Sequence, residues 1–277
     1  MTVGARGMLV AMAAAIAVSA SPAAAAEYDI RAADNAVWIA GGGTSMDYAE
    51  HYRGQTLDTE QGWLQSWAAG LSLLAIDDGK APLRNLYARI DSTLATGTTA
   101  YAGSYQNGSP LTTTTDTTVW TMSGRLGRAF AVAPTLMLIP YGEYGYRSWD
   151  RNITGPGGYD ETYHNSDVVG GVMVQYSPMD KLVLTAEGGG GYTFAAHMHA
   201  AAPFNADFTL GAEPTWRIGG QAGYTFARRW EAITSIGYSQ MAYGISAPVP
   251  TPLGTSLEPD STTAETTLRA GLAWHFY

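Results

Sequence analysis

The sequence predicts an all-β fold: a transmembrane antiparallel up-and-down β-barrel of about ten strands, with eight or twelve strands as alternatives. Three observations predict it. Apolar side chains alternate with polar or small ones through most of the 277 residues. The connections between the alternating runs are short and long in turn. The chain also ends inside such a run, "TTLRAGLAWHFY", so that a strand extends to the last residues.

The first 26 residues have the pattern of a secretory signal peptide. Arg6 is the only charge before Glu27, the apolar run "MLVAMAAAIAVSA" follows it, and small residues come next. A basic start, an apolar run of roughly 7–15 residues and an A-x-A-like site are typical of such a peptide. The alternative, an N-terminal membrane anchor, needs about 20 apolar residues. We therefore expect export, cleavage after Ala26, and one barrel domain over residues 27–277.

The composition excludes several classes of protein. A formal net charge of −9 argues against a nucleic-acid partner, because nucleic acid is bound by basic patches. The absence of cysteine excludes disulfides and thiolate metal sites. The 33 glycines lie largely within alternating stretches, which disfavours a helical fold. No later stretch is long and apolar enough to predict a transmembrane helix.

Each alternating run is predicted as one strand. In "WRIGGQAGYTF", for example, Trp216 and Ile218 fall on one face and Arg217 on the other. The runs separated by "DDGKAP", "AP", "SPMD" and "ARRW" are joined by tight turns, while the other connections are long and polar, including "TTTTDTT" as a loop tip. The predicted strands cover 36–52, 62–75, 85–102, 117–133, 135–152, 164–178, 181–198, 213–229, 230–246 and 263–277.

Aromatic residues near the strand ends predict two girdles at the membrane interfaces. The residues of the two girdles are Trp38, Trp120, Trp216 and Trp274, and Tyr48, Tyr146, Phe194 and Phe226. The alternative is a soluble β-sandwich or lipocalin-like barrel, in which the apolar faces point inward. Long strands, charges on the polar faces and alternating loop lengths favour the membrane barrel. Its surroundings are then outer-membrane lipid and lipopolysaccharide, and we expect a monomer.

The last strand resembles the recognition signal of bacterial outer-membrane proteins, which end in an aromatic residue after alternating apolar positions. The corresponding residues are Leu272, Trp274, Phe276 and Tyr277, of which Phe276 rather than Tyr277 continues the apolar register. The first hairpin, "MDYAEHYRGQTLDTEQGWLQSWAAGLSLL", resembles a broad family of small proteobacterial outer-membrane β-barrels. This resemblance implies the fold, an outer-membrane location and insertion by the outer-membrane assembly machinery. It implies no defined activity.

If the apolar faces meet lipid, the polar faces line the lumen. The predicted lumenal charges are Arg89, Asp91, Arg125, Glu143, Arg147, Glu187, Arg217 and Arg269, with Asp47 and Asp167 nearer the rims. Roughly eight strands leave an interior just filled by side chains, whereas 16–18 leave an aqueous channel. We therefore expect the charges to pair across the lumen and largely plug it, because unpaired buried charges are costly. The alternative is a narrow pore whose arginines favour small anions.

Histidines and acids near the predicted outer rim suggest two catalytic hypotheses. His197 and His199 are expected on the lumenal face of one strand, where they could bind a metal or act as acid and base. Asp160, Glu161 and His164 resemble the rim residues of the ten-stranded omptin proteases. The spacing differs from the omptin pattern, so no catalytic residue is assigned and an omptin-like hydrolase is a distant alternative. We predict neither enzyme activity nor a cofactor.

Acidic pairs occur in three of the predicted long loops. They are Asp58 with Glu60, Asp160 with Glu161, and Glu258 with Asp260. Carboxylates suit divalent cations, which would place such ions at the lipopolysaccharide surface. The alternative, simple solvation of exposed loops, is favoured, and no metal site is assigned.

Overall fold

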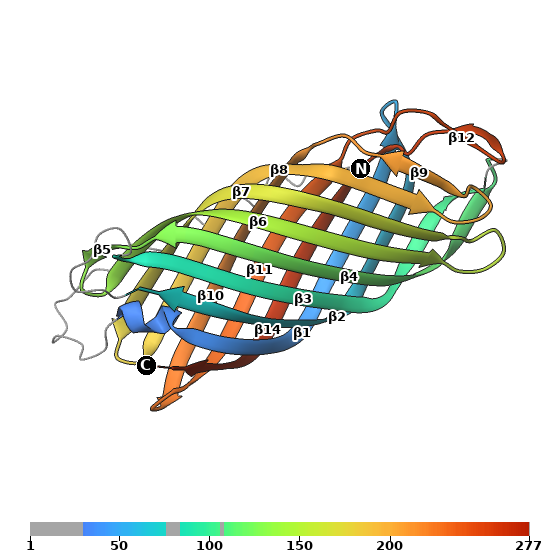
Figure 1. The fold of residues 1–277 in the computed structure, drawn as a ribbon. Coiled ribbons are helices and arrows are strands. Elements are labelled where there is room, and N and C mark those ends of the chain that lie inside the picture. Colours follow the sequence, from blue (N-terminus) through green and yellow to red (C-terminus); the bar gives the residue numbers. More distant parts are fainter. Residues whose placement is uncertain (1–29, 76–83, 106–107, 277) are drawn as a thin grey trace.

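Ten long strands form a closed antiparallel barrel in the computed structural model, which describes residues 30–75, 84–105 and 108–276 (Figure 1). Each strand pairs with its neighbours in the ring, and β14 closes the ring by pairing with both β11 and β1. In ring order the strands are β1 (Ala36–Tyr52), β2 (Gln55–Leu74), β3 (Leu86–Ser104), β4 (Pro110–Arg128), β6 (Leu136–Ile153), β7 (Asp160–Met179), β8 (Leu182–Ala200), β10 (Pro214–Ala227), β11 (Trp230–Tyr243) and β14 (Asp260–His275).

Shorter elements lie at the two ends of this barrel. Strand β5 (Phe130–Ala133) pairs with β6, and β9 (Ala206–Thr209) pairs with β8. Strands β12 (Val249–Thr251) and β13 (Gly254–Ser256) form a separate hairpin, and the 3₁₀ helix η2 (Ile30–Asp34) precedes β1. We call the end with η2 and the chain's C-terminus the terminal end, and the end with β9 and β12 the loop end (Figure 1).

The pairing of β1 with β14 confirms the predicted closed barrel. Their register runs from Ala36 opposite His275 to His51 opposite Asp260, so the first and last strands are paired along nearly their whole length. A closed ring leaves no unpaired strand edge, and an unpaired edge has no hydrogen-bonding partner in lipid. Among the described residues, no helix is long and apolar enough to cross a membrane.

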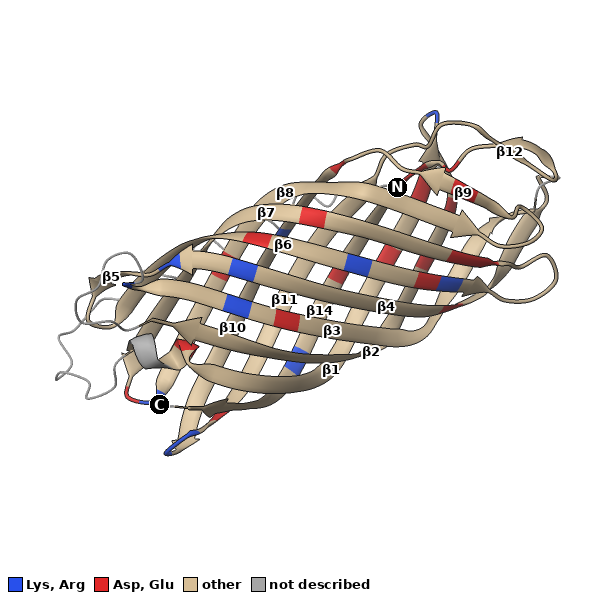
Figure 2. Cartoon of the chain, in the orientation of Figure 1, with Lys and Arg blue, Asp and Glu red and all other residues tan. Residues whose placement is uncertain are grey.

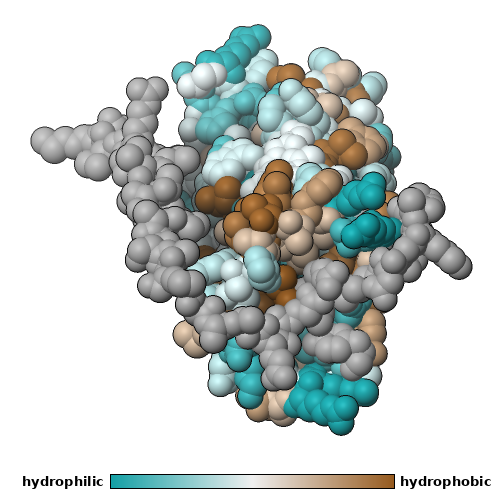
Figure 3. All heavy atoms as spheres, turned by 90° about the vertical axis from the view of Figure 1, so that its left-hand side faces the viewer, coloured by the Kyte–Doolittle hydropathy of each residue, from teal (hydrophilic) through white to brown (hydrophobic). Residues whose placement is uncertain are grey.

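The outer wall carries the large apolar side chains. On β1, Val37 and Ile39 are exposed while Ala36 and Ala40 are buried. The same alternation exposes Trp63 and Trp67 on β2. A soluble monomer seldom exposes so much contiguous apolar surface, whereas a membrane barrel requires it. Figure 3, which faces the terminal end, also shows apolar residues gathered near the centre of that view.

The prediction of three long loops is wrong, because strands extend into these segments. Strand β2 begins at Gln55, directly after a turn in which Arg53 and Gly54 both have positive φ (52° and 78°). Such a pair of left-handed residues closes a tight hairpin. Residues 112–118, predicted as a loop tip, lie within β4, and β7 begins at Asp160. The prediction was wrong because it took polar residues as a sign of loops, whereas in these strands polar residues occupy both the buried and the exposed faces.

Two aromatic residues assigned to the girdles face the lumen instead. Tyr48 is 2% exposed and Trp38 is covered by Arg89, whose Cζ lies 5.0 Å from the indole ring centroid. Both share the even-numbered face of β1 with the buried Ala36, Ala40 and Met46. The odd-numbered face carries the apolar residues that meet lipid. In contrast, Trp120, Phe194 and Phe226 are exposed on the outer wall as predicted.

Apolar residues and η2 close the terminal end of the lumen. Ile30 packs in a buried cluster whose other members are Leu74, Tyr87, Ala129, Met137, Ile139, Tyr141 and Met173. Asp34 at the end of η2 is 5% exposed and accepts a hydrogen bond from Gln175 Nε2 at 3.0 Å. Burial raises the pKa of Asp34 from 3.8 to about 6. The segment that precedes β1 is thus anchored inside the barrel by a carboxyl group that is costly to ionise.

We expect the anchoring of η2 by Asp34 to weaken as the pH rises. Since the folded pKa lies above the ordinary value, the ionisation penalty is absent below about pH 4 and complete above about pH 6. A difference of two pKa units corresponds to about 3 kcal/mol. Asp34→Asn should therefore be more stable than wild type at pH 7 and equal to it at acidic pH, as measured by thermal unfolding in detergent. If the stability difference between wild type and Asp34→Asn stayed the same at every pH, this prediction would be contradicted.

Candidate functional site: the lumen

The lumen holds a polar chamber of about 320 Å³ at the level of its charged residues. All eight charged residues predicted for the lumen line this chamber. Figure 2 shows basic and acidic residues on neighbouring strands through the middle of the barrel, with acidic residues more frequent toward β9. The side chains therefore narrow the interior without filling it.

A chain of ion pairs joins five strands across one side of the chamber. Arg125 Nη1 lies 2.6 Å from Glu187 Oε2, and its Nη2 lies 2.7 Å from Glu143 Oε2. Glu143 also pairs with Arg217, whose Nη2 lies 2.7 Å from Asp167 Oδ2. The guanidinium of Arg125 also packs on the ring of Tyr141 at 3.9 Å. This arrangement crosslinks β4, β6, β7, β8 and β10 through side chains.

The other lumenal arginines differ in their partners. Arg89 pairs with Asp91 at 2.8 Å, and Arg147 pairs with Glu265 at 2.6 Å. Arg269 donates hydrogen bonds to Ser66 Oγ at 2.9 and 2.7 Å, and no described carboxylate lies within ion-pair distance of it. The sequence prediction omitted Glu265, although it shares the inward-facing parity of Arg269 on β14.

The two acids expected near the lumen rims have different positions. Asp167 lies in the lumen, where it pairs with Arg217. The expectation for Asp47 is wrong, because Asp47 is exposed on the outer face of β1 between the buried Met46 and Tyr48. Its odd position on the strand directs it outward.

A second charged site, centred on Arg151, lies nearer the loop end and was not predicted. The Arg151 side chain is fully buried, and its Nη2 lies 2.7 Å from Glu60 Oε1. Its Nη1 pairs with Glu161 and lies 3.4 Å from Glu50 Oε1. Thr99 and Thr115 donate hydrogen bonds to the two oxygens of Glu60, at 3.0 and 2.9 Å. One guanidinium thus contacts three carboxyl groups contributed by three different strands, and its single positive charge can balance only one of them.

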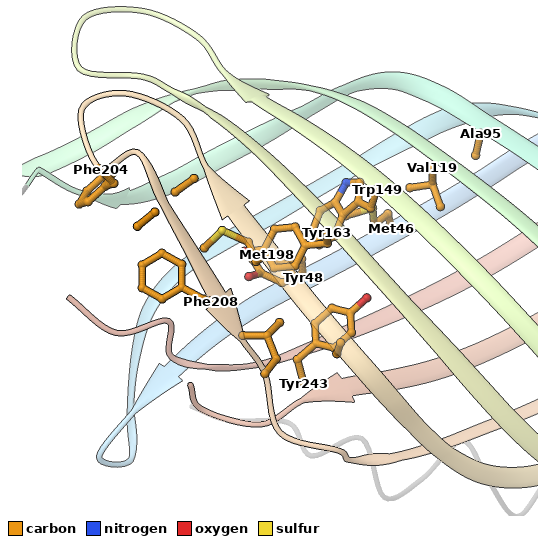
Figure 4. Packing of buried hydrophobic residues seen from close by; sticks show 14 of the residues in the cluster. Met46, Tyr48, Ala95, Val119, Trp149, Tyr163, Met198, Phe204, Phe208 and Tyr243 are labelled. Atoms are coloured by element: carbon orange, nitrogen blue, oxygen red, sulfur yellow. The ribbon is translucent and has the colours of Figure 1, made fainter. Parts of the chain in front are cut away.

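Aromatic side chains surround the Arg151 guanidinium. Its Cζ lies 4.6 Å from the ring centroid of Tyr48, 5.2 Å from that of Trp149 and 5.9 Å from that of Tyr163. Figure 4 shows these three rings close together inside the barrel with Met198 beside them. They belong to a buried apolar cluster that extends to Phe208 near the loop end. We call this buried cluster the aromatic cluster; its members are Met46, Tyr48, Leu64, Ala95, Val119, Trp149, Tyr163, Ala196, Met198, Ala200, Phe204, Ala206, Phe208, Leu210 and Tyr243. It narrows the lumen between the chamber and the loop end.

Most of the acids expected in exposed loops are buried. Glu60 is 0%, Glu161 3%, Glu258 7% and Asp58 9% exposed. The expectation of solvation is wrong for these four. Strands β2 and β7 extend into the predicted loops and direct Asp58, Glu60 and Glu161 inward, whereas Glu258 lies between β13 and β14, where its backbone pairs with Ser246. Asp160 and Asp260 are exposed as expected. Within the described residues, no group of three or more His, Asp or Glu side chains has the arrangement of a metal site.

The histidines of the two catalytic hypotheses face outward. His197 and His199 are exposed on the outer wall, and His199 Nδ1 lies 2.7 Å from Asp207 Oδ1. Their predicted lumenal position is wrong because Ala195 adopts positive φ (48°), and the register between β7 and β8 shifts at this irregularity. His164 is likewise exposed and lies directly opposite His197 on the neighbouring strand. The structure therefore separates these histidines from the lumenal acids.

The predicted insertion signal lies at the terminal end of β14. Leu272 is exposed and Trp274 is partly exposed on the outer face, and Phe276 is 36% exposed just beyond the last strand residue, His275. Tyr277 lies outside the described residues, as does the predicted signal peptide over residues 1–26. The strand therefore ends slightly before the predicted limit of 277.

Comparison with known proteins identifies the fold. No protein-family model and no curated protein matches the sequence. The outer membrane protease OmpT from Escherichia coli aligns with 87% of this chain and 96% of its own, with a TM-score of 0.59 and 10% identity. Neisserial surface protein A aligns with 87% and 97% (TM-score 0.34, 9% identity), and a major outer membrane protein from Thermus thermophilus with 87% and 99% (0.36, 12%).

These similarities concern the fold alone, because all three identities are low. The chain has the fold of bacterial outer-membrane β-barrels, with ten strands in its ring. The predicted outer-membrane location agrees with this fold. The activity of a structural neighbour does not follow from the shared fold.

Proposed function

We propose that the protein is a non-conducting outer-membrane barrel with a structural or surface-interaction role, in which paired charges and packed side chains block the lumen. The observation that carries the proposal is the ion-pair chain Glu187–Arg125–Glu143–Arg217–Asp167, which narrows the chamber from one side. The aromatic cluster and the apolar residues around η2 support it from the two ends. To cross the barrel, water and ions must pass the aromatic cluster, the ion-pair chain and the apolar residues around η2.

The proposal includes the surroundings predicted from the sequence. The apolar outer wall fits a monomer in outer-membrane lipid and lipopolysaccharide, inserted by machinery that recognises Leu272, Trp274, Phe276 and Tyr277. It does not include a catalytic activity, because His164, His197 and His199 lie on the outer wall, away from the lumenal carboxyl groups.

Planar-bilayer recording tests the blocked lumen. The purified full chain, inserted into a bilayer, is expected to show no sustained single-channel current. Glu143→Gln is expected to remain silent or to show brief openings, since the variant loses two ion pairs of the chain but retains both ends of the block. Stable, long-lived current steps from the wild-type chain would overturn the proposal.

A narrow anion-selective pore is the second candidate. The observation in its favour is Arg269, which lines the chamber and hydrogen-bonds a serine rather than a carboxylate. If wild type conducts, this candidate predicts a preference for chloride over potassium that Arg269→Gln reduces. Measurement of the reversal potential in a salt gradient distinguishes it from a non-selective leak.

A further inference from the structure

The segment between β11 and β14 covers part of the loop end. Residues 244–259 include the hairpin β12–β13, and Figure 1 shows β12 beside β9 at this end. We call this segment the cover. Val249 of the cover packs against the aromatic cluster, and Gly244 exchanges two backbone hydrogen bonds with Gly211, at 3.0 and 3.1 Å.

The two ends of the cover are held together by Ser246 and Glu258. The Ser246 amide donates to the Glu258 carbonyl at 2.9 Å, and the Glu258 amide donates to Ser246 Oγ at 2.8 Å. This pairing brings the Glu258 side chain to the barrel interior, where it is 7% exposed. The Tyr163 hydroxyl of β7 donates to Glu258 Oε1 at 2.6 Å. This bond joins the cover to the Arg151 site.

The groups that face Glu258 are predominantly acidic. No described cation lies within ion-pair distance of Glu258, and Arg151 already pairs with Glu50, Glu60 and Glu161. The titratable and charged groups that interact with it are Tyr48 and Glu50 on β1, Arg151 on β6, Tyr159 between β6 and β7, and Glu161 and Tyr163 on β7. Asp58, Glu60 and Tyr101 belong to the adjoining Arg151 site.

Ionisation of Glu258 is therefore unfavourable while the cover is closed. Burial and then the nearby Glu50 and Glu161 raise the pKa of Glu258 well above its ordinary range. The single Tyr163 hydroxyl proton also faces Glu161, whose Oε2 lies 3.2 Å away, so it cannot satisfy both carboxyl groups at once. Opening would return an ionised Glu258 to water.

We propose that residues 244–259 are a pH-dependent cover, closed over the loop end while Glu258 is protonated and released when Glu258 ionises. Because the closed state favours the protonated carboxyl, its population falls as the pH rises. Release exposes the Arg151 site and the aromatic cluster to the outside. The proposal does not depend on whether the lumen conducts.

Thiol labelling measures the opening directly, because the chain has no native cysteine. Ser261 at the start of β14 is 3% exposed and becomes a buried reporter in Ser261→Cys. The labelling rate by a charged maleimide is compared with and without Glu258→Gln from about pH 5 to about pH 9. Glutamine keeps the acceptor oxygen for Tyr163 but cannot ionise. Thr255→Cys, at an exposed site, corrects for the intrinsic pH dependence of the thiol.

At the lowest pH, we expect Ser261→Cys to be labelled at the same rate with Glu258 and with Glu258→Gln. As the pH rises, the rate in the Glu258 background should exceed that in the Glu258→Gln background by about tenfold or more, since one unit of pKa shift is tenfold in population. A ratio that stays constant across the pH range would overturn the proposal. If Glu258→Gln does not fold, Tyr163→Phe provides the test: it removes the donor and should speed labelling at acidic pH, and an unchanged rate there would contradict the cover.

Discussion

Arg151→Met is expected to lower the free energy of unfolding by about 3–5 kcal/mol, because breaking a buried ion-pair network leaves uncompensated charge in the interior. Arg151 is the cation shared by Glu50, Glu60 and Glu161. Methionine approximates the volume of the aliphatic stem, so the loss reflects charge and hydrogen bonds more than packing. Without Arg151, the three carboxyl groups would have to be protonated, or water would have to enter the site and solvate them.

Urea unfolding of the barrel in lipid vesicles measures this effect. Arg128→Met is the matched control, because Arg128 is exposed at the end of β4 and its removal should change stability by about 0.5 kcal/mol or less. Adding Glu60→Gln to Arg151→Met should restore part of the stability, since it removes one of the uncompensated charges. Equal stability of Arg151→Met and Arg128→Met would show that the buried network contributes nothing.

Glu143→Gln is expected to have the second largest effect, a loss of about 3 kcal/mol. The carboxyl group of Glu143 is nearly inaccessible and pairs with both Arg125 and Arg217. Glutamine retains one oxygen acceptor but no charge, so two guanidinium groups share the remaining Glu187 and Asp167. The crosslink between β4, β6 and β10 would weaken at its centre.

Asp91→Asn is the matched control for Glu143→Gln. Asp91 also pairs with an arginine in the lumen, but its side chain is 21% exposed and it pairs with Arg89 alone. Because it is more accessible to water and has a single arginine partner, its loss should cost less than that of Glu143, about 1 kcal/mol. The same urea titration compares the two variants, and a greater loss for Asp91→Asn would contradict the central role of Glu143.

The inward and outward faces of the strands could largely be predicted from the sequence. Alternation with period two requires only the order of residues along one strand, and it assigned all eight predicted charges to the chamber wall. The prediction was wrong where the alternation is interrupted or weak. At Ala195 a single residue in positive φ turns His197 and His199 outward. On β1, glycines and small residues left the face of Trp38 and Tyr48 ambiguous.

The Arg151 site could not be predicted because two of its strands, β2 and β7, extend into stretches that the sequence predicts as loops. Glu60 and Glu161 lie in polar stretches that resemble loops, and polarity alone does not distinguish a loop from a strand wall facing a lumen. Their partner Arg151 is 91 residues from Glu60 along the chain. Only the pairing register of the ring places such residues side by side, and Glu265 beside Arg147 is a further example.

The fold class, the outward apolar surface and the eight predicted charges of the chamber follow from the sequence, because each depends on periodicity within one strand. The identity of the ion pairs, the burial of Glu258 and the aromatic cluster around Arg151 depend on the tertiary structure. Ring closure and strand register set the distances between residues far apart in sequence, and the electrostatic energy of a charged side chain depends on those distances and on its burial.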